Sequence, residues 1–161
     1  MDIINRVQDR YPTHLLIYPI SVQGNKSAGE IIKGIEFFNK RINVDTIIIA
    51  RGGGGAEDLL SFNDENVVKS AFASKIPIIS AIGHETDFTL LDLVADYRAS
   101  TPTAAAAKAV PEKTVLIEKI FAFNKQLISN FNLFLREKDK NVYQLVKSLN
   151  INNLKNFIFF S

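Results

Sequence analysis

The chain has 161 residues, of which 47% are hydrophobic and 22% charged, a composition typical of a globular protein with a core of its own. Nineteen basic and seventeen acidic residues give a formal net charge of +2, which allows a nucleic-acid partner only where basic side chains cluster locally. The absence of cysteine excludes disulfides and cysteine-ligated zinc, and no apolar run resembles a secretion signal or reaches membrane-spanning length, so we expect a cytoplasmic protein.

The first two-thirds of the chain alternate between apolar runs of strand length and stretches with helical spacing. A helix that begins at Asp2 is followed by apolar runs, which predict buried strands over residues 14–20, 45–50 and 76–82. Apolar residues at helical spacing predict helices over residues 27–42, from residue 63 and over residues 88–95. Ser27, with Glu30 three residues later, would cap the first of these three helices. The alternation predicts an α/β fold over residues 1–103, an open parallel, Rossmann-like sheet with flanking helices.

The last third of the chain, residues 104–161, has a different pattern, which predicts a long coiled-coil-like helix. Thr101 and Pro102 have the form of a helix start, and Pro111 predicts a break or restart. From residue 117 to residue 149 a seven-residue repeat places apolar side chains at eight of ten seam positions. A helix this apolar must pack on the sheet domain, on a second copy or on a partner chain. Because no strand precedes the first helix and the repeat is lost near the end, we expect both segments to be truncated.

The loop after the second predicted strand carries the first candidate site. Arg51 stands at the end of this strand, and four glycines follow it, Gly52, Gly53, Gly54 and Gly55. Ligands bind at the carboxyl ends of strands in open α/β sheets, glycines let backbone N–H groups approach an anion, and an arginine can bind two phosphate oxygens. The loop therefore predicts a phosphate site, with a flexible turn as the alternative. It lacks the lysine of a P-loop and the third glycine of a dinucleotide-binding loop, which argues against NTP and NAD sites.

The loop after the third predicted strand, GHETD over residues 83–87, carries candidate acid–base groups. His84 and Asp87 would face the arginine–glycine loop from the neighbouring strand end, where His84 could act as a general acid or base. The alternatives are a structural histidine and a helix-capping role for Asp87. Arg98 could make a second phosphate contact. The spacing of the acidic residues defines no metal site.

Three long motifs stand out in the sequence. They are ARGGGGAEDLLSFNDE (residues 50–65), ASKIPIISAIGHETDFT (73–89) and LVADYRASTPTAAAA (93–107). In this order and at this spacing they resemble the large subunit of bacterial exonuclease VII, and the match runs from about residue 2 to residue 107. The resemblance implies hydrolysis of single-stranded DNA to oligonucleotides without a strict metal requirement. The chain departs from the family at Gly55, where serine is often found, and at Leu60, where tryptophan is frequent.

The resemblance also implies which residues act. Asp2, Arg51, His84 and Asp87 match the aspartate, arginine, histidine and aspartate that are essential in the family. Arg51 and the amides of Gly52 to Gly55 would bind the scissile phosphate, and His84 would serve as general base or acid. Asp87 would orient His84 or, together with Asp2, hold an optional Mg²⁺ ion.

The partners implied by the resemblance are single-stranded DNA and several copies of a small subunit on the helical region. The apolar repeat also allows a second copy of the chain to bind through the long helix. No membrane partner is expected. The family has an N-terminal OB-fold and a distal helical region that are incomplete here, so we expect the isolated fragment to be inactive. The alternative function is a truncated, non-catalytic module that binds phosphate or a nucleotide and serves assembly.

Overall fold

The computed structural model describes residues 2–21, 26–41, 43–52, 56–83 and 87–149. The chain divides into two compact units, Met1–Lys113 and Thr114–Ser161. The first unit is an α/β structure, and the described part of the second is helical. The predicted candidate sites all belong to the first unit.

Three parallel strands form the sheet of the first unit, in the order β1 (Ile47–Ala50), β2 (Ile78–Ala81) and β3 (Tyr97–Arg98). β1 and β2 are paired from Ile47 with Ile78 to Ala50 with Ala81. β2 has a neighbour on both sides and is buried at every residue, as expected for the central strand of a covered parallel sheet. The predicted parallel α/β sheet is confirmed, and the predicted strands over residues 45–50 and 76–82 contain β1 and β2.

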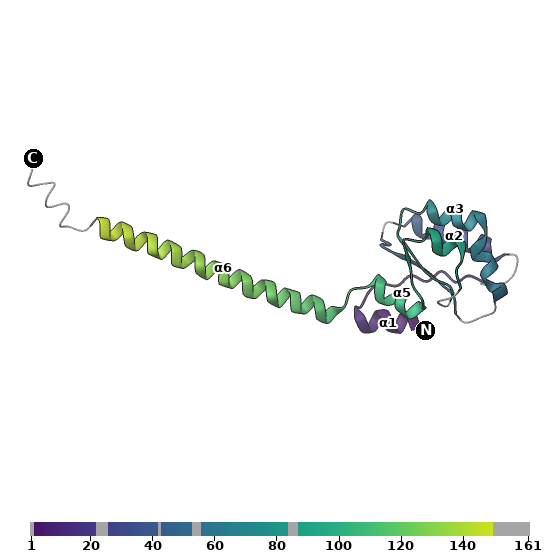
Figure 1. The fold of residues 1–161 in the computed structure, drawn as a ribbon, viewed down its shortest axis with the longest axis horizontal. Coiled ribbons are helices and arrows are strands. Elements are labelled where there is room, and N and C mark those ends of the chain that lie inside the picture. Colours follow the sequence, from purple (N-terminus) through teal and green to yellow (C-terminus); the bar gives the residue numbers. More distant parts are fainter. Residues whose placement is uncertain (1, 22–25, 42, 53–55, 84–86, 150–161) are drawn as a thin grey trace, which may run out of the picture. The chain divides into compact units, whose positions relative to one another are not determined.

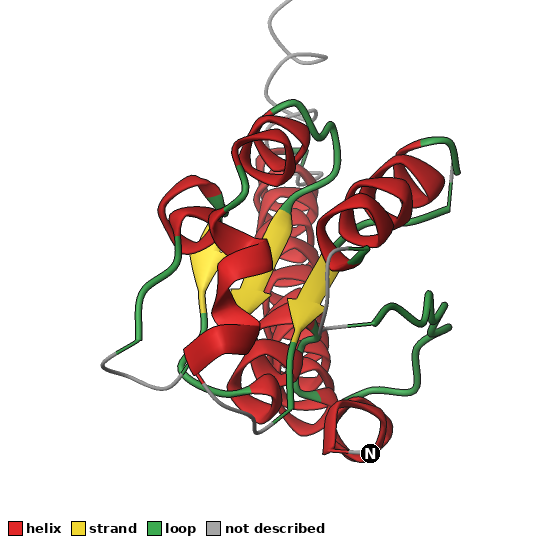
Figure 2. Ribbon diagram, turned by 90° about the vertical axis from the view of Figure 1, so that its right-hand side faces the viewer, coloured by secondary structure: helices red, strands yellow, loops and turns green. Residues whose placement is uncertain are grey.

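Helices cover both faces of this sheet (Figure 2). In chain order they are α1 (Asp2–Arg10), α2 (Ser27–Asn39), the 3₁₀ helix η1 (Ala56–Asn63), α3 (Glu65–Phe72), α4 (Leu90–Val94) and α5 (Pro102–Ala109), and the long α6 (Lys113–Ser148) follows (Figure 1). Successive strand residues point to opposite faces. Ile78 packs with α2, α3, η1 and α4 on one face, whereas Ile79 packs with α5 on the other. α1 packs against α5 through Val7 and Ala106.

Side-chain caps define the starts of three helices in the first unit. Asp64 accepts hydrogen bonds from the backbone N–H groups of the first turn of α3. Thr89 caps α4 in a capping box. Thr101 accepts a hydrogen bond from Ala104 N at 3.0 Å, with Pro102 in the first turn of α5. The predicted helix start at Thr101 and the break near Pro111, which lies between α5 and α6, are confirmed.

The predicted strand over residues 14–20 is wrong. These residues have no regular secondary structure, and none of them forms a backbone-to-backbone hydrogen bond within the described part of the chain. A strand needs a neighbouring strand as hydrogen-bond partner for its backbone N–H and C=O groups, and no described strand is paired with this segment. The segment packs only in part: Tyr18 is half-buried against Gly34, with its ring centroid 5.1 Å from that of Phe37, whereas Ile17 is exposed.

The predicted cap at Ser27 is wrong as well. Ser27 is the first residue inside α2, and Lys26 occupies the N-cap position without a side-chain hydrogen bond. Glu30, which would complete the capping box, accepts a hydrogen bond from Ser21 N at 2.7 Å instead. The glutamate therefore ties the preceding segment to α2 rather than closing the first turn of the helix.

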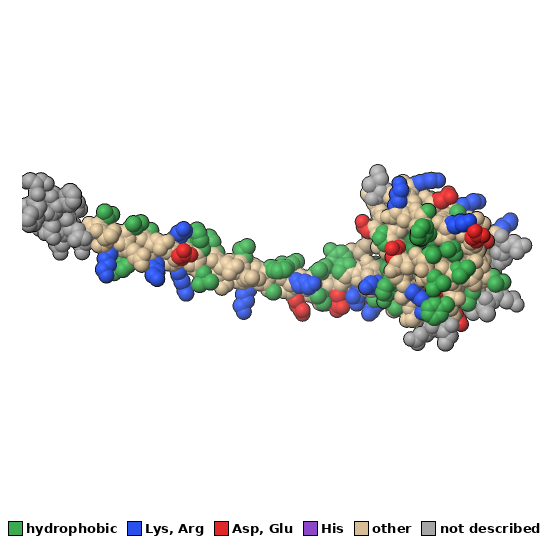
Figure 3. Space-filling view, turned by 45° about the horizontal axis from the view of Figure 1, so that its top comes forward, with side chains coloured by type: hydrophobic (Ala, Val, Ile, Leu, Met, Phe, Trp, Pro, Cys, Tyr) green, Lys and Arg blue, Asp and Glu red, His purple; other side chains and the backbone are tan. Residues whose placement is uncertain are grey.

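The long helix α6 has 36 residues, and none of them is buried. Its seven-residue repeat leaves large apolar side chains exposed, among them Phe121, Ile128 and Leu145. Figure 3 shows hydrophobic side chains together with lysine and arginine along this helix. Among the described helices, none combines the length and the apolar character that crossing a membrane requires.

Candidate active site

The carboxyl ends of the three strands meet at one edge of the sheet, because the strands are parallel and in register. Arg51 follows β1 directly, Gly83 lies two residues after the end of β2, and Arg98 is the last residue of β3. The two loops that the sequence identifies as candidate sites therefore leave the sheet at the same edge.

Arg51 is held by the sheet and is buried. Its backbone N–H donates to the carbonyl oxygen of Ala81 at 3.1 Å, which extends the β1–β2 ladder by one residue. Only 6% of Arg51 is exposed, which is rare for a charged residue. Gly52, by contrast, borders open space, since a Cβ atom there would meet no heavy atom within 4 Å. The sheet thus fixes the backbone of Arg51, and the backbone of the next residue, Gly52, is accessible to a ligand.

A cavity of about 630 Å³ lies beside β1. Asp2, Arg51 and Gly52 line it, together with apolar side chains of α1 and of residues 15–18. Asp2 is the first residue of α1, and it is exposed. The structure therefore brings two of the four predicted catalytic residues, Asp2 and Arg51, to one cavity with the dimensions of a small-ligand site.

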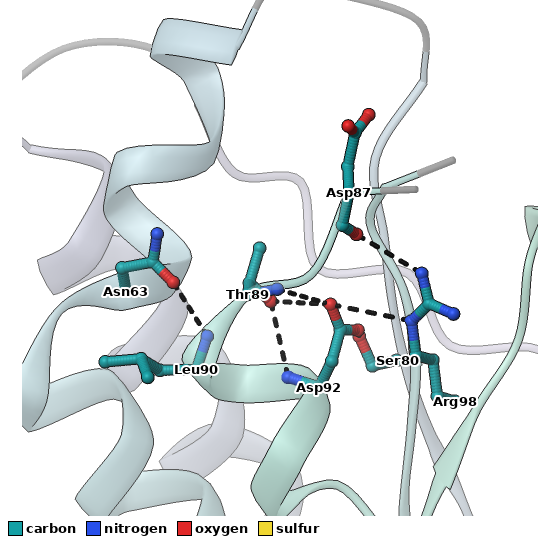
Figure 4. A network of polar contacts seen from close by, with 7 residues as sticks. All are labelled: Asn63, Ser80, Asp87, Thr89, Leu90, Asp92 and Arg98. Carbon is teal, nitrogen blue, oxygen red and sulfur yellow. Dashed lines mark hydrogen bonds and ion pairs between the residues drawn. The ribbon is translucent and has the colours of Figure 1, made fainter. Parts of the chain in front are cut away.

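Asp87 is the last residue of the second candidate loop, and it lies close in space to Gly83, the first residue of that loop. A Cβ atom on Gly83 would lie 2.5 Å from the carbonyl oxygen of Asp87. The same oxygen accepts a hydrogen bond from Arg98 Nη2 at 3.2 Å. The alternative of a capping role for Asp87 is wrong, because α4 begins at Leu90 and Thr89 is its cap. The Asp87 carboxylate points away from Arg98 (Figure 4).

Several predicted site residues lie outside the described residues. They are His84, Gly53, Gly54 and Gly55, whose assigned roles stay predictions. Asp87 is described but is not among the residues that line the cavity beside β1. Within the described part of the chain, no group of three or more histidine, aspartate or glutamate residues could hold a metal ion.

A buried polar network next to Asp87 is a feature that the sequence interpretation missed. The carboxylate of Asp92 accepts hydrogen bonds from Ser80 Oγ and from the N–H and hydroxyl groups of Thr89, the latter two at 2.8 Å (Figure 4). Arg98 Nε lies 3.8 Å from the same carboxylate. The available signal was Thr89 with Asp92 three residues later, a capping-box pattern directly after the GHETD motif.

Comparisons with known proteins agree with one another. A family model described as "Exonuclease VII, large subunit" matches residues 1–158. The exodeoxyribonuclease 7 large subunit of Rickettsia canadensis is 51% identical over 144 residues, which are 88% of this chain and 32% of that relative. The proteins of the same name from Bartonella tribocorum and Clostridioides difficile are 55% and 59% identical, over 70% and 68% of this chain and 25% and 28% of theirs.

The chain thus spans about a third or less of the length of these relatives. The match nevertheless extends over both units, since it includes the sheet, the loops at its carboxyl edge and most of the long helix. On this evidence the chain belongs to the exonuclease VII large subunit family.

Proposed function

We propose that this chain is the catalytic part of an exonuclease VII large subunit, which hydrolyses phosphodiester bonds of single-stranded DNA and releases oligonucleotides. The relatives named exodeoxyribonuclease 7 large subunit support this proposal. The structural observation that carries it is the buried Arg51, which lines one cavity with Asp2 at the carboxyl edge of the sheet. A guanidinium at such a position is suited to bind an anionic phosphate.

The reaction needs an attacking water, charge stabilisation and a protonated leaving group. A water oxygen attacks phosphorus, the bond from phosphorus to the leaving sugar oxygen breaks, and a proton passes to that oxygen. Arg51 and the backbone N–H groups from Gly52 onward bind the non-bridging oxygens as their negative charge grows. His84 removes the proton of the water or protonates the leaving oxygen. Asp87 orients His84, and Asp2 lies at the wall of the cavity that Arg51 lines.

Metal ions are not required in this mechanism. Asp2 and Asp87 are the carboxylates that could supply oxygen ligands to Mg²⁺. Of these two, Asp2 lines the cavity beside β1 and Asp87 does not, and the described residues include no group of three or more possible ligands, so no step above depends on a metal ion. Mg²⁺ is therefore proposed as optional.

The proposal extends to the fold and the partners of the whole protein. The sheet belongs to a larger Rossmann-like arrangement in a cytoplasmic protein. The apolar seam of α6 is covered in a coiled coil, either by a second large subunit or by copies of the small subunit. The exposed apolar repeat of α6 supports this assignment, because such a surface is unfavourable in water.

A substitution of His84 tests the catalytic assignment. His84→Ala, in the full-length large subunit co-expressed with the small subunit, should remove cleavage of a labelled single-stranded oligonucleotide and leave its binding intact. We expect a loss of at least about 100-fold in kcat, the usual scale for a general acid or base. The control is Glu36→Ala, since the Glu36 side chain is exposed on α2 and does not line the cavity beside β1. Full cleavage by the His84 variant would refute the assignment.

A further inference from the structure

Asp92 is a buried ionisable group close to the end of the GHETD loop. Its side chain is 1% exposed, and donors from three parts of the fold surround it. Ser80 donates from the central strand β2, and Thr89 donates its N–H and hydroxyl groups from the cap of α4. Arg98 approaches from β3, with 3.8 Å between its Nε and the Asp92 carboxylate. A carboxylate bound by this many donors is fixed in orientation.

Arg98 faces both Asp92 and the end of the GHETD loop. Its Nη2 donates to the carbonyl oxygen of Asp87 at 3.2 Å, and its guanidinium carbon lies 3.9 Å from the centroid of the Phe88 ring. The side chain is 22% exposed. The Arg98 guanidinium thus contacts Asp87, the last residue of the loop, and Phe88, the residue after it. Its Nε faces the buried carboxylate of Asp92.

The geometry at the beginning of the loop shows why this contact matters. The backbone of Gly83 lies against Asp87, so the loop from residue 83 to residue 87 is closed at its base. The carboxylate of Asp87 points away from Arg98 and Asp92 (Figure 4). A rotation of Arg98 would weaken the hold on Asp87 and would leave a buried carboxylate without its cationic partner, which is costly.

We propose that Asp92 and Arg98 form a positioning pair, in which Asp92 orients Arg98 and Arg98 holds the backbone of Asp87 and the ring of Phe88. The pair presents the Asp87 side chain at the carboxyl edge of the sheet. Arg98 is then a positioning residue rather than the phosphate contact expected from the sequence. This inference rests on the proposed nuclease function, because it assigns a catalytic role to the loop that the pair holds.

Charge-conserving and shape-conserving substitutions separate the two roles of Arg98. Arg98→Lys keeps the positive charge but cannot reach Asp92 and the Asp87 carbonyl with one planar group. Asp92→Asn keeps the shape but removes the charge that orients Arg98. If Arg98 contacts a phosphate, replacing its planar guanidinium weakens that contact, and both KM and the dissociation constant for DNA rise. A positioning pair would instead affect kcat, because misplacing a reacting group by about 1 Å costs about 100-fold in rate.

The experiment measures kcat, KM and DNA affinity for Arg98→Lys, Asp92→Asn and the double variant, in the full-length large subunit with its small subunit. We expect kcat to fall about 10- to 100-fold in each, with KM and the dissociation constant within about twofold of wild type. The double variant should be no slower than the slower single variant, because both changes break one unit. The control is Arg41→Lys, since Arg41 also stacks on a ring, that of Phe37, at 4.2 Å, and should not affect kcat.

Amide hydrogen exchange at residues 87–90 gives a readout that does not depend on cleavage. Exchange should be faster in Arg98→Lys than in wild type and unchanged in Arg41→Lys. A raised KM with normal kcat would overturn the proposal in favour of a phosphate contact, and normal kcat with normal exchange would overturn it outright. If Asp92→Asn does not fold, Arg98→Lys decides alone. Absence of cleavage in the wild-type complex would refute the nuclease function, and the exchange measurement would still test the pair.

Discussion

At Gly83, close packing against Asp87 leaves no room for a side chain. A Cβ atom at this position would lie 2.5 Å from Asp87 O and 2.9 Å from Asp87 Cβ, well inside contact distance. Gly83→Ala must therefore push Asp87 away and shift the loop that carries His84. We predict a fall in kcat of about 100-fold or more, because a displacement of this size misaligns reacting groups.

The matched control for Gly83→Ala is Gly29→Ala. Gly29 lies in α2, and a Cβ atom there would meet nothing within 4 Å. This substitution should leave kcat unchanged and raise stability by about 0.5–1 kcal/mol, since alanine favours a helix more than glycine does. Steady-state kinetics and urea unfolding of both variants check the prediction, and equal kcat values in the two variants would contradict it.

Single residues also mark how far the site could be predicted. Arg51 was predicted as a site residue because it stands at the carboxyl end of a predicted strand, directly before four glycines, and the structure places it beside the cavity. Asp92 was not recognised, because its surroundings depend on Ser80 and Arg98. These two residues come from the strands β2 and β3, whereas Asp92 lies in α4. Sequence spacing reveals the Thr89–Asp92 capping box but does not reveal that the same carboxylate lies beside Arg98.

At the scale of elements, α3 depends on its N-cap. Asp64 Oδ1 accepts hydrogen bonds from Asn66 N at 2.8 Å and from Val67 N at 3.3 Å. Asp64→Ala should lower the free energy of unfolding by about 1 kcal/mol, because both N–H groups lose their partner in the first turn. Urea unfolding followed by circular dichroism measures this change.

A neighbouring ion pair supplies the comparison for the cap. Glu65 and Lys69 are 2.6 Å apart on the surface of α3, and both side chains are more than half exposed. Glu65→Gln should change stability less than Asp64→Ala does, because exposed ion pairs contribute little. The account of α3 fails if the two variants lose the same stability.

Elements were predictable where the local pattern and the tertiary environment agree. β1 and β2 lie inside the runs DTIIIA and IPIISAI because strands covered on both faces need continuous apolar sequence. Residues 14–20 have the same kind of run, but none of them is buried and no strand is paired with them within the described chain, so the apolar pattern alone did not decide the structure. The Ser27 cap failed similarly, because Glu30 bonds to Ser21.

At the scale of the whole molecule, the two units differ in whether their apolar side chains are buried. The first unit buries a core on both faces of its sheet, whereas α6 buries none of its residues. Proteins that expose a long apolar helix normally cover it in an assembly. We therefore propose that cleavage be tested in the assembled complex, in which α6 would be covered.

The most direct test of the nuclease function is degradation of labelled single-stranded DNA by the full-length large subunit with its small subunit, in EDTA and in Mg²⁺, beside the same sequence as a duplex. We predict that the single strand is cut to oligonucleotides in both buffers while the duplex stays intact. A complex that binds the single strand but leaves it uncut in both buffers would contradict the nuclease function and would identify the chain as a phosphate-binding assembly module.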